Sequence, residues 1–530
     1  MKIFNSKYTY LWVFLCGFFI CAFGIGSSII YILDEAKNSE AAREMWIYGQ
    51  YFKPTFNNVI RTDKPPFHYF LMMLGYKLFG VNAFGARFFS AVFGGMTFLS
   101  TYIFTKKHLG KSIAQITFWI LIASFYFVQE FHLAVPDPYL IFWVSLTFFC
   151  YIDFFISREK KILWLLYFSV GFGMLTKGPI ALVLPSLIAL IHLLLTKDLS
   201  VKTILDFRFI PGILLALLLS APWFYMAHIA TDGVFTDGFF FKHNLDRFQN
   251  KMEGHGGIFL ITIGFVILGM FPFSFWLFRA LIHSLKQKKQ NAFVFYGGLT
   301  VFVFIGFFAI SSTKLPNYTM PCYPMIAVLL AWYFYTELKP KYLEGNLKAF
   351  KIEWISLMVI SIALPIAGYI GLDLEKQLGN KGWVGLLIAF VPLGVIWAYR
   401  QFIRKQVNKS FKTLVSTFAL LSLMLFGVAF PILTKGTPVE VYKNKVGTQK
   451  QVVVFKRFDA AFPINFDRTY KVVNTLEEID AFFERYPEGV VMTKTRKKED
   501  LKKLEVYSLV FQQKSLFENH TTRVYQKSKK

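Results

Sequence analysis

The chain has 530 residues, of which 55% are hydrophobic and 19% aromatic, while only 17% are charged. A soluble domain cannot bury that much apolar surface, whereas a protein that crosses a bilayer many times exposes it to lipid. The formal net charge of +26 does not indicate a nucleic-acid partner, because the basic residues lie in short loops between apolar segments, where they orient a protein in a membrane.

Apolar runs recur along the first 432 residues, and a run of about 20 residues spans a bilayer core. The sequence therefore predicts a polytopic α-helical membrane protein with about thirteen transmembrane helices. They are expected near 8–32, 83–104, 112–130, 138–156, 162–176, 179–195, 209–228, 258–281, 292–311, 318–336, 351–371, 382–400 and 413–432. The first run lacks a convincing small-residue cleavage site, so we expect it to remain as an anchor.

The loops between these runs alternate in character. One set is short and basic, and the positive-inside rule places it in the cytoplasm together with the N-terminus. The other set then faces outward. It contains the stretches 34–82, 134–139, 175–179, 229–257 and 311–318, which hold nearly all the unusual polar motifs. This distribution predicts one active face on the non-cytoplasmic side.

The stretch 34–50 directly follows the first apolar run and is rich in charge. Ala41, Met45 and Tyr48 recur three to four residues apart, which predicts a helix that rests one side on the lipid interface.

Residues 433–530 have a different composition, and we expect them to form a small α/β domain. Segments 451–456, 489–494 and 506–513 resemble strands, and 475–489 resembles a helix capped by Thr475 with Glu478 three residues later. An odd number of spans after a cytoplasmic N-terminus would put this domain outside as well.

Charged residues gather at the predicted outer ends of the helices, where they are costly unless they are paired or line a wet cavity. Carboxylates beside several fixed cations suit a reaction that releases an anionic group such as phosphate from a carbon centre. Lys and Arg can neutralise the phosphate without a metal, and a carboxylate can accept a proton from the acceptor. The candidates are Asp34, Glu35, Asp63, Lys64, Asp137, Lys177, His243, Arg247, Glu253, His255 and Lys314.

A divalent metal ion is a further hypothesis. His243, Glu253 and His255, with Asp246 between them, could ligate an ion, although their spacing matches no standard zinc pattern. The alternative is ordinary hydrogen bonding within a partly buried loop.

An ordered set of short motifs resembles the bacterial aminoarabinose–lipid A transferase family, which are membrane glycosyltransferases of the GT-C fold related to protein O-mannosyltransferases. The motifs are DE at 34–35, AARE at 41–44, DKPP at 63–66, DP at 137–138, LTKGP at 175–179, PW at 222–223, FFFKHNLDRF at 239–248, EGH at 253–255 and KLPNY at 314–318. The resemblance implies transfer of a sugar from a polyprenyl-phosphate carrier to lipid A or another envelope acceptor, at the outer face of a bacterial inner membrane.

The resemblance also implies roles for individual residues. Asp34 matches the principal catalytic acid of the family and Asp137 a second functional acid. Lys64 matches the lysine that binds the carrier phosphate, and Arg247 and Tyr318 match positions that line the donor pocket.

A hydroxyl acceptor would need Asp34 or Glu35 as a base, whereas a phosphate acceptor would need little base assistance. We expect Lys37, Lys177 and Lys314 to add positive charge at the donor phosphate. The chain departs from the family at Lys37 and Asn38, where an Arg-Tyr pair is common, and at Asn317, where a histidine is common. Lysine cannot bind phosphate in the bidentate manner of arginine. The departures therefore leave open a sugar other than aminoarabinose or an acceptor other than lipid A.

Two other functions fit the same residues. A protein O-glycosyltransferase would use the same fold on a different acceptor. A flippase or transporter of a lipid-linked sugar would line its path with the same charges, but the one-sided motifs and the lack of an evident half-chain repeat argue against it.

Overall fold

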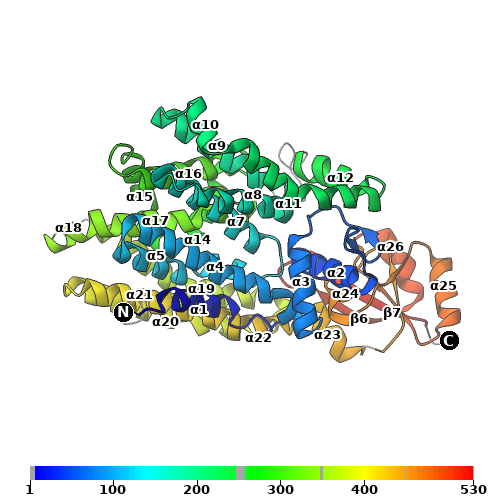
Figure 1. Cartoon of the computed structure of the whole chain (residues 1–530). Coiled ribbons are helices and arrows are strands. Elements are labelled where there is room, and N and C mark those ends of the chain that lie inside the picture. Colours follow the sequence, from blue (N-terminus) through cyan, green and yellow to red (C-terminus); the bar gives the residue numbers. More distant parts are fainter. Residues whose placement is uncertain (1–5, 246–256, 346–349, 448, 529–530) are drawn as a thin grey trace.

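The computed structural model describes residues 6–245, 257–345, 350–447 and 449–528. Most of them form an elongated helical bundle, and the C-terminal residues form a sheet with helices at one end of it (Figure 1). The N-terminal end of the chain lies toward the end of the bundle that is farthest from the sheet.

The bundle begins at α1 and each predicted apolar run contains helical residues. Its first half consists of α1 (Thr9–Ala22), α4 (Ala83–Leu109), α5 (Lys111–Ala123), α6 (Phe125–Glu130), α7 (Asp137–Ser157), α8 (Lys161–Lys177), α9 (Ile180–Thr196), α10 (Val201–Asp206), α11 (Phe209–Ala230), α12 (Val234–Asp237) and the π-helix η2 (Gly238–Leu245). Its second half consists of α14 (Phe259–Gly269), η3 (Phe273–Trp276), α15 (Leu277–Leu285), α16 (Ala292–Ile310), η4 (Pro316–Cys322), α17 (Tyr323–Tyr333), η5 (Phe334–Leu338), α18 (Lys339–Leu343), α19 (Lys351–Asp373), η7 (Lys376–Leu378), η8 (Gly382–Ile388), α20 (Phe390–Ile403), α21 (Val407–Met424), η9 (Leu425–Ala429) and α22 (Phe430–Thr434).

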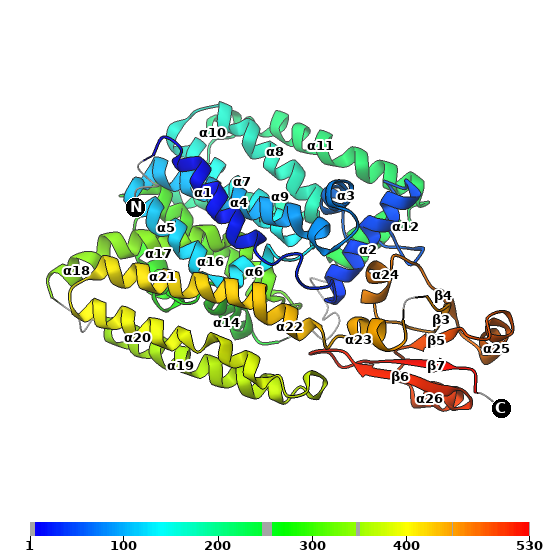
Figure 2. The same cartoon turned by 90° about the horizontal axis from the view of Figure 1, so that it is seen from below.

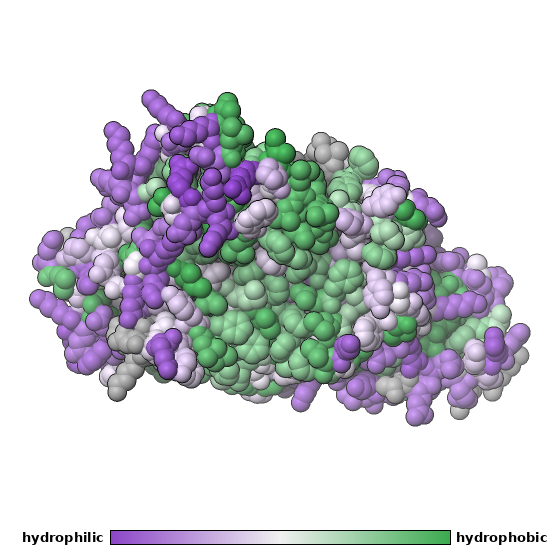
Figure 3. All heavy atoms as spheres, in the orientation of Figure 1, coloured by the Kyte–Doolittle hydropathy of each residue, from purple (hydrophilic) through white to green (hydrophobic). Residues whose placement is uncertain are grey.

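The lengths of these helices support membrane insertion. Within the described ranges, seven helices are long and apolar enough to cross a bilayer, and five further apolar helices have 10–17 residues. Apolar side chains cover the middle of the molecule, whereas hydrophilic ones gather at its two ends (Figure 3). The chain is thus a polytopic helical membrane protein, as predicted, and the number thirteen stays a prediction.

The stretch between α1 and α4 folds into two helices and a short hairpin. These are α2 (Leu33–Tyr48), β1 (Thr55–Phe56), β2 (Val59–Ile60) and α3 (Phe67–Phe79). The expectation that Ala41 and Met45 face lipid is wrong, because both are fully buried, whereas Tyr48 is exposed together with Trp46 and Ile47. Ala41 and Met45 belong to an apolar core shared with α3 and the C-terminal residues.

The C-terminal residues form a five-stranded sheet in the order β4-β3-β5-β7-β6, in which β3 pairs parallel with β4 and β5, and β7 pairs antiparallel with β5 and β6. Its elements are α23 (Pro438–Lys445), β3 (Val452–Phe455), α24 (Ala461–Phe466), β4 (Lys471–Val473), α25 (Leu476–Arg485), β5 (Val490–Thr493), α26 (Lys498–Lys503), η10 (Leu504–Val506), β6 (Ser508–Lys514) and β7 (Thr521–Gln526). The three predicted strands are confirmed, and so is the helix, which carries a complete capping box between Thr475 and Glu478. The division of the chain after residue 432 stays a prediction.

The sheet docks on the stretch 34–82, and Figure 2 shows α2 lying beside α24. The Asn57 side chain donates to the Tyr470 carbonyl at 2.9 Å and accepts from the Tyr470 N–H at 2.7 Å. The Asn465 side chain donates to the Ile30 carbonyl at 2.6 Å. These bonds tie the segments on either side of α2 to the C-terminal residues.

Candidate active site

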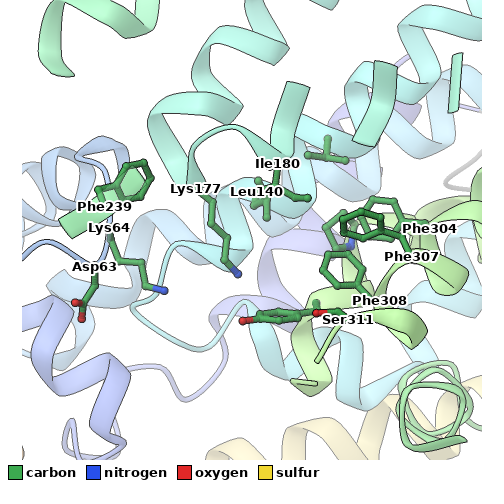
Figure 4. Close-up of a pocket in the computed structure, with 13 residues that line it drawn as sticks. Asp63, Lys64, Leu140, Lys177, Ile180, Phe239, Phe304, Phe307, Phe308 and Ser311 are labelled. Atoms are coloured by element: carbon green, nitrogen blue, oxygen red, sulfur yellow. The ribbon is translucent and has the colours of Figure 1, made fainter. Parts of the chain in front are cut away.

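A cavity lies where α7, α8, α9 and α16 meet the segment before α3. It has a volume of about 860 Å³ including the space at its open mouth. Aromatic and aliphatic side chains form most of its wall, and charged groups stand at one end (Figure 4). The lining residues are Asp63, Lys64, Leu140, Val144, Lys177, Ile180, Phe239, Phe304, Phe307, Phe308, Ser311, Tyr318 and Pro321.

The charged end of the cavity joins residues that are far apart in the sequence. The Lys177 ammonium bonds the Asp137 carboxylate at 2.6 Å and lies 5.0 Å from the centre of the Tyr318 ring. Lys64, which is 8% exposed, extends its ammonium into the same space as Lys177 (Figure 4). The structure therefore brings together Lys64, Asp137, Lys177 and Tyr318, all of which the sequence singled out.

The turn between α8 and α9 explains how Lys177 reaches this position. Gly178 has a φ of +80°, which a residue with a side chain rarely adopts. A Cβ atom at Gly178 would lie 2.6 Å from the ring of Phe239, so glycine also allows Phe239 to close over the turn. Pro179 then directly precedes α9. Lys177 is held as the last residue of α8, pointing into the cavity.

Glu35 has a different environment from the one expected of a base. Its carboxylate accepts from Arg87 Nε at 2.6 Å and Arg87 Nη2 at 2.9 Å, and also from the Ala134 N–H at 2.9 Å. Arg87 Nη1 in turn donates to the carbonyls of Ile25 and Ser28. Because both oxygens of Glu35 are bonded and the residue is fully buried, the geometry favours a positioning role. The pair ties α2 to α4, and the bond from Ala134 ties α2 to the segment just before α7.

Asp34 lies in the first turn of α2, and its side chain is exposed. It interacts electrostatically with Tyr69 and with Glu130. Asp34 does not line the cavity, but its charge acts on Glu130, which in turn interacts with Asp137 and Lys177 at the charged end.

Glu130 is a residue that the sequence analysis missed. It is the last residue of α6, is 6% exposed, and interacts with Asp137 and Lys177 and with the side chain of Asn317. A carboxylate within an otherwise apolar run was the available signal. Glu130 adds an acidic group beside the Asp137–Lys177 pair.

Two predicted phosphate ligands do not line the cavity. Lys314 donates to the carbonyl of Ser311 at 2.6 Å. Lys37 is half-buried, and its charge acts on Lys494, which directly follows β5. Burial lowers the pKa of Lys494, and the charges of Lys37 and Arg457 lower it further.

The predicted metal site is largely outside the described residues. Glu253 and His255 fall in 246–256, as does Arg247, the residue predicted to line the donor pocket, and His243 is described only as part of the backbone of η2. In the part of the chain that the structure covers, no group of three or more His, Cys, Asp or Glu side chains could hold a metal ion. The metal hypothesis stays a prediction.

Comparison with known proteins is consistent with this geometry. Residues 63–226 match the family model described as dolichyl-phosphate-mannose-protein mannosyltransferase. An uncharacterized protein of Aquifex aeolicus is 30% identical over 348 residues, which cover 65% of this chain and 67% of that protein. The undecaprenyl phosphate-alpha-4-amino-4-deoxy-L-arabinose arabinosyl transferase of Pseudomonas aeruginosa is 26% identical over 394 residues, covering 72% and 70%.

The crystal structure of ArnT from Cupriavidus metallidurans bound to undecaprenyl phosphate superposes with a TM-score of 0.81 at 17% identity, and covers 98% of both chains. The chain belongs to the ArnT-like family of GT-C membrane glycosyltransferases. Membership confirms the sequence-based prediction of a glycosyltransferase.

Within the ArnT-like family, the geometry of this member separates two groups of its polar residues. Asp63, Lys64, Lys177 and Tyr318 line the cavity. Glu35, Lys37 and Lys314 do not line it: Glu35 is bonded to Arg87, Lys314 donates to the carbonyl of Ser311 in the cavity wall, and the charge of Lys37 acts on Lys494.

Proposed function

We propose that the chain transfers a sugar from a polyprenyl-phosphate carrier to a lipid A-like or other envelope acceptor on the periplasmic face of the inner membrane. The observation that carries this proposal is the amphipathic cavity. Its wall of Phe304, Phe307 and Phe308 suits a prenyl chain, and the ammonium groups of Lys64 and Lys177 suit the phosphate attached to it.

The reaction needs little covalent chemistry from the protein. An oxygen of the acceptor forms a bond to the anomeric carbon, the bond from that carbon to the phosphate oxygen breaks, and polyprenyl phosphate leaves with the electron pair. Lys64 and Lys177 stabilise the negative charge that develops on the phosphate. Where the acceptor is a hydroxyl, its proton passes to the carboxylate of Asp34.

Asp137 acts through Lys177 in this scheme. The 2.6 Å ion pair orients the ammonium toward the cavity, and α7 begins at Asp137, where the helix dipole favours a carboxylate. Glu130 and Asn317 border the same pair, so they help to set its orientation.

The periplasmic position of the site rests on charge distribution. The basic loops indicate a cytoplasmic end of the bundle, and the stretch 34–82 and the C-terminal sheet dock together at the other end. The C-terminal sheet would then stand over the membrane surface, where a lipid or glycan acceptor arrives.

The test is transfer from radiolabelled polyprenyl-phosphate sugars to a membrane lipid extract by the purified full chain. We expect Asp34→Asn and Lys64→Ala to reduce transfer by about 10²-fold or more. Lys77→Ala is a matched control, since Lys77 is an exposed lysine on α3 away from the cavity. Its transfer rate should remain that of the wild type.

The labelled product also separates the alternatives. Label in lipid or glycan supports the proposal, whereas label in protein would favour the O-glycosyltransferase. Movement of labelled lipid across proteoliposomes with no transfer from any donor would favour the flippase.

A further inference from the structure

Arg61 is a buried arginine two residues before Asp63 of the cavity wall, and not all of its hydrogen-bond donors are bonded. Arg61 is 5% exposed. Its Nη2 donates to Asn38 Oδ1 at 3.0 Å and pairs with Asp63 Oδ2 at 3.2 Å. Among the described residues, Arg61 Nε, Arg61 Nη1 and Asn38 Nδ2 are buried and have no hydrogen-bond partner.

Three unpartnered donors in one place indicate a ligand. Buried N–H groups in native proteins are nearly always bonded to protein, to ordered water or to a bound molecule, because leaving them unbonded is costly. All three atoms are donors, and a guanidinium has no acceptor at all. A molecule that satisfies them must therefore present acceptor oxygens.

The donors lie beside the groups that the proposed reaction uses. Asn38 follows Asp34 by one turn of α2, so the two residues lie on the same side of that helix. Tyr69 interacts with Arg61, and the charges of Asp63 and Asp34 also act on its hydroxyl. Asp63 and Lys64 continue the group into the wall of the cavity.

The groups around Arg61 also restrict the ligand. Burial lowers the pKa of His68 well below its usual range, and the positive charges of Arg61 and Lys64 lower it further. Arg61 is at the same time paired with the Asp63 carboxylate at 3.2 Å, so both signs of charge are present beside His68. An ammonium group has no acceptor and could not bond the open donors of Arg61 and Asn38.

We propose that Arg61 and Asn38 bind oxygen substituents of the transferred sugar and determine which sugar is accepted. The group that faces them is a hydroxyl or a carboxylate, so the donor carries a neutral or acidic sugar at this position in place of an ammonium-bearing one. This inference rests on the proposed function, since it takes the sugar to be attached to a lipid phosphate in the neighbouring cavity. It assigns selection of the sugar to α2 and the segment before α3, and binding of the carrier to Lys64 and Lys177.

The test compares three ligands on the same full-length protein in detergent: polyprenyl phosphate alone, polyprenyl phosphate carrying a neutral hexose, and polyprenyl phosphate carrying an aminopentose. We expect Arg61→Gln and Asn38→Ser to weaken binding of the hexose-bearing carrier by about tenfold or more, the effect of losing one or two hydrogen bonds. Binding of polyprenyl phosphate alone should change by less than about twofold. Arg61→Lys keeps the charge beside Asp63 but loses the planar donors, so it should show the same selective loss.

The outcomes distinguish this inference from the proposed function. Equal losses for polyprenyl phosphate alone and for the hexose-bearing carrier, or no loss for either, would overturn the role of Arg61 and Asn38 in sugar recognition and would leave structural water as the partner of their donors. Tighter wild-type binding of an aminopentose carrier than of the hexose carrier would overturn the exclusion of an ammonium group. If the wild type bound none of the three ligands, the proposed function itself would fail. Asn38→Ser carries the test if the Arg61 variants do not fold.

Discussion

Of the buried arginines near α2, Arg87 and Arg61 differ in how completely their donors are bonded. Arg87 bonds Glu35 through Nε and Nη2, and donates to two backbone carbonyls through Nη1. Arg61 bonds Asn38 and Asp63 through Nη2, while its Nε and Nη1 have no partner in the described ranges.

This difference distinguishes an arginine that stabilises the fold from an arginine that binds a ligand. A buried charge whose partners are all supplied by the protein holds elements together, because removing any partner exposes the full cost of burying the charge. A buried charge with open donors is prepared to bind a molecule that supplies the acceptors. Substitutions in the first group should therefore reduce stability, and substitutions in the second should reduce ligand binding or rate.

The largest effect is expected at the Glu35–Arg87 pair, whose charged groups are all bonded within the protein. Arg87→Leu leaves the carboxylate of Glu35 buried without its cation, which should lower the free energy of unfolding by about 3–5 kcal/mol. Thermal unfolding of the purified protein in detergent measures it. The double variant Glu35→Leu, Arg87→Leu should recover much of the loss, since it removes both charges. An unchanged unfolding midpoint in the single variant would show that the pair is not a scaffold.

Asp137→Asn should affect rate more than stability. The amide has nearly the same shape as the carboxylate but no charge to orient the Lys177 ammonium, which lies 2.6 Å away. We expect transfer to fall on the order of 10²-fold, with an unfolding midpoint close to that of the wild type. Initial rates with a saturating donor check this. Full activity would remove the ion pair from the mechanism.

The smallest effect is a pH dependence in the C-terminal sheet. Burial lowers the pKa of His520, but hydrogen bonds to Asp459 and Glu518 outweigh it and raise the pKa to about 8. A raised pKa stabilises the fold below the unfolded value of about 6.5, and the stabilisation disappears as pH rises through about 8. The loss should be about 2 kcal/mol at most.

Unfolding midpoints of the wild type and of His520→Gln across pH 6 to 9 test this dependence. The wild type should lose stability over that range, and the variant should show a flatter curve. Because the partners of His520 are supplied by the protein and not by a ligand, transfer activity at pH 7 should be the same in both proteins. A parallel pH dependence in the two would exclude His520 as its source.

Much of the fold could be predicted from the sequence, because apolar runs of the right length have few stable alternatives to membrane helices. The packing of α2 could not. An apolar stripe such as Ala41 and Met45 fits lipid or protein equally well, and what covers it includes Phe462, more than four hundred residues further along the chain. The sequence pattern gave the stripe but not its partner.

Part of the site could also be predicted from the sequence. Charge at the predicted outer ends of the helices identified Lys64, Asp137 and Lys177, because charged groups there are costly unless they are paired or line a wet cavity. Neighbours on α2 could not be assigned, since successive residues of a helix point about 100° apart. Glu35 turns toward Arg87, and the charge of Lys37 acts on Lys494.

The most direct test of the account is a cryo-electron microscopy structure of the full chain with polyprenyl phosphate. The account predicts that the phosphate lies within hydrogen-bond distance of the ammonium groups of Lys64 and Lys177, with the first prenyl units along Phe304, Phe307 and Phe308. A phosphate bound beside Lys37 and Lys494, away from this cavity, would contradict it.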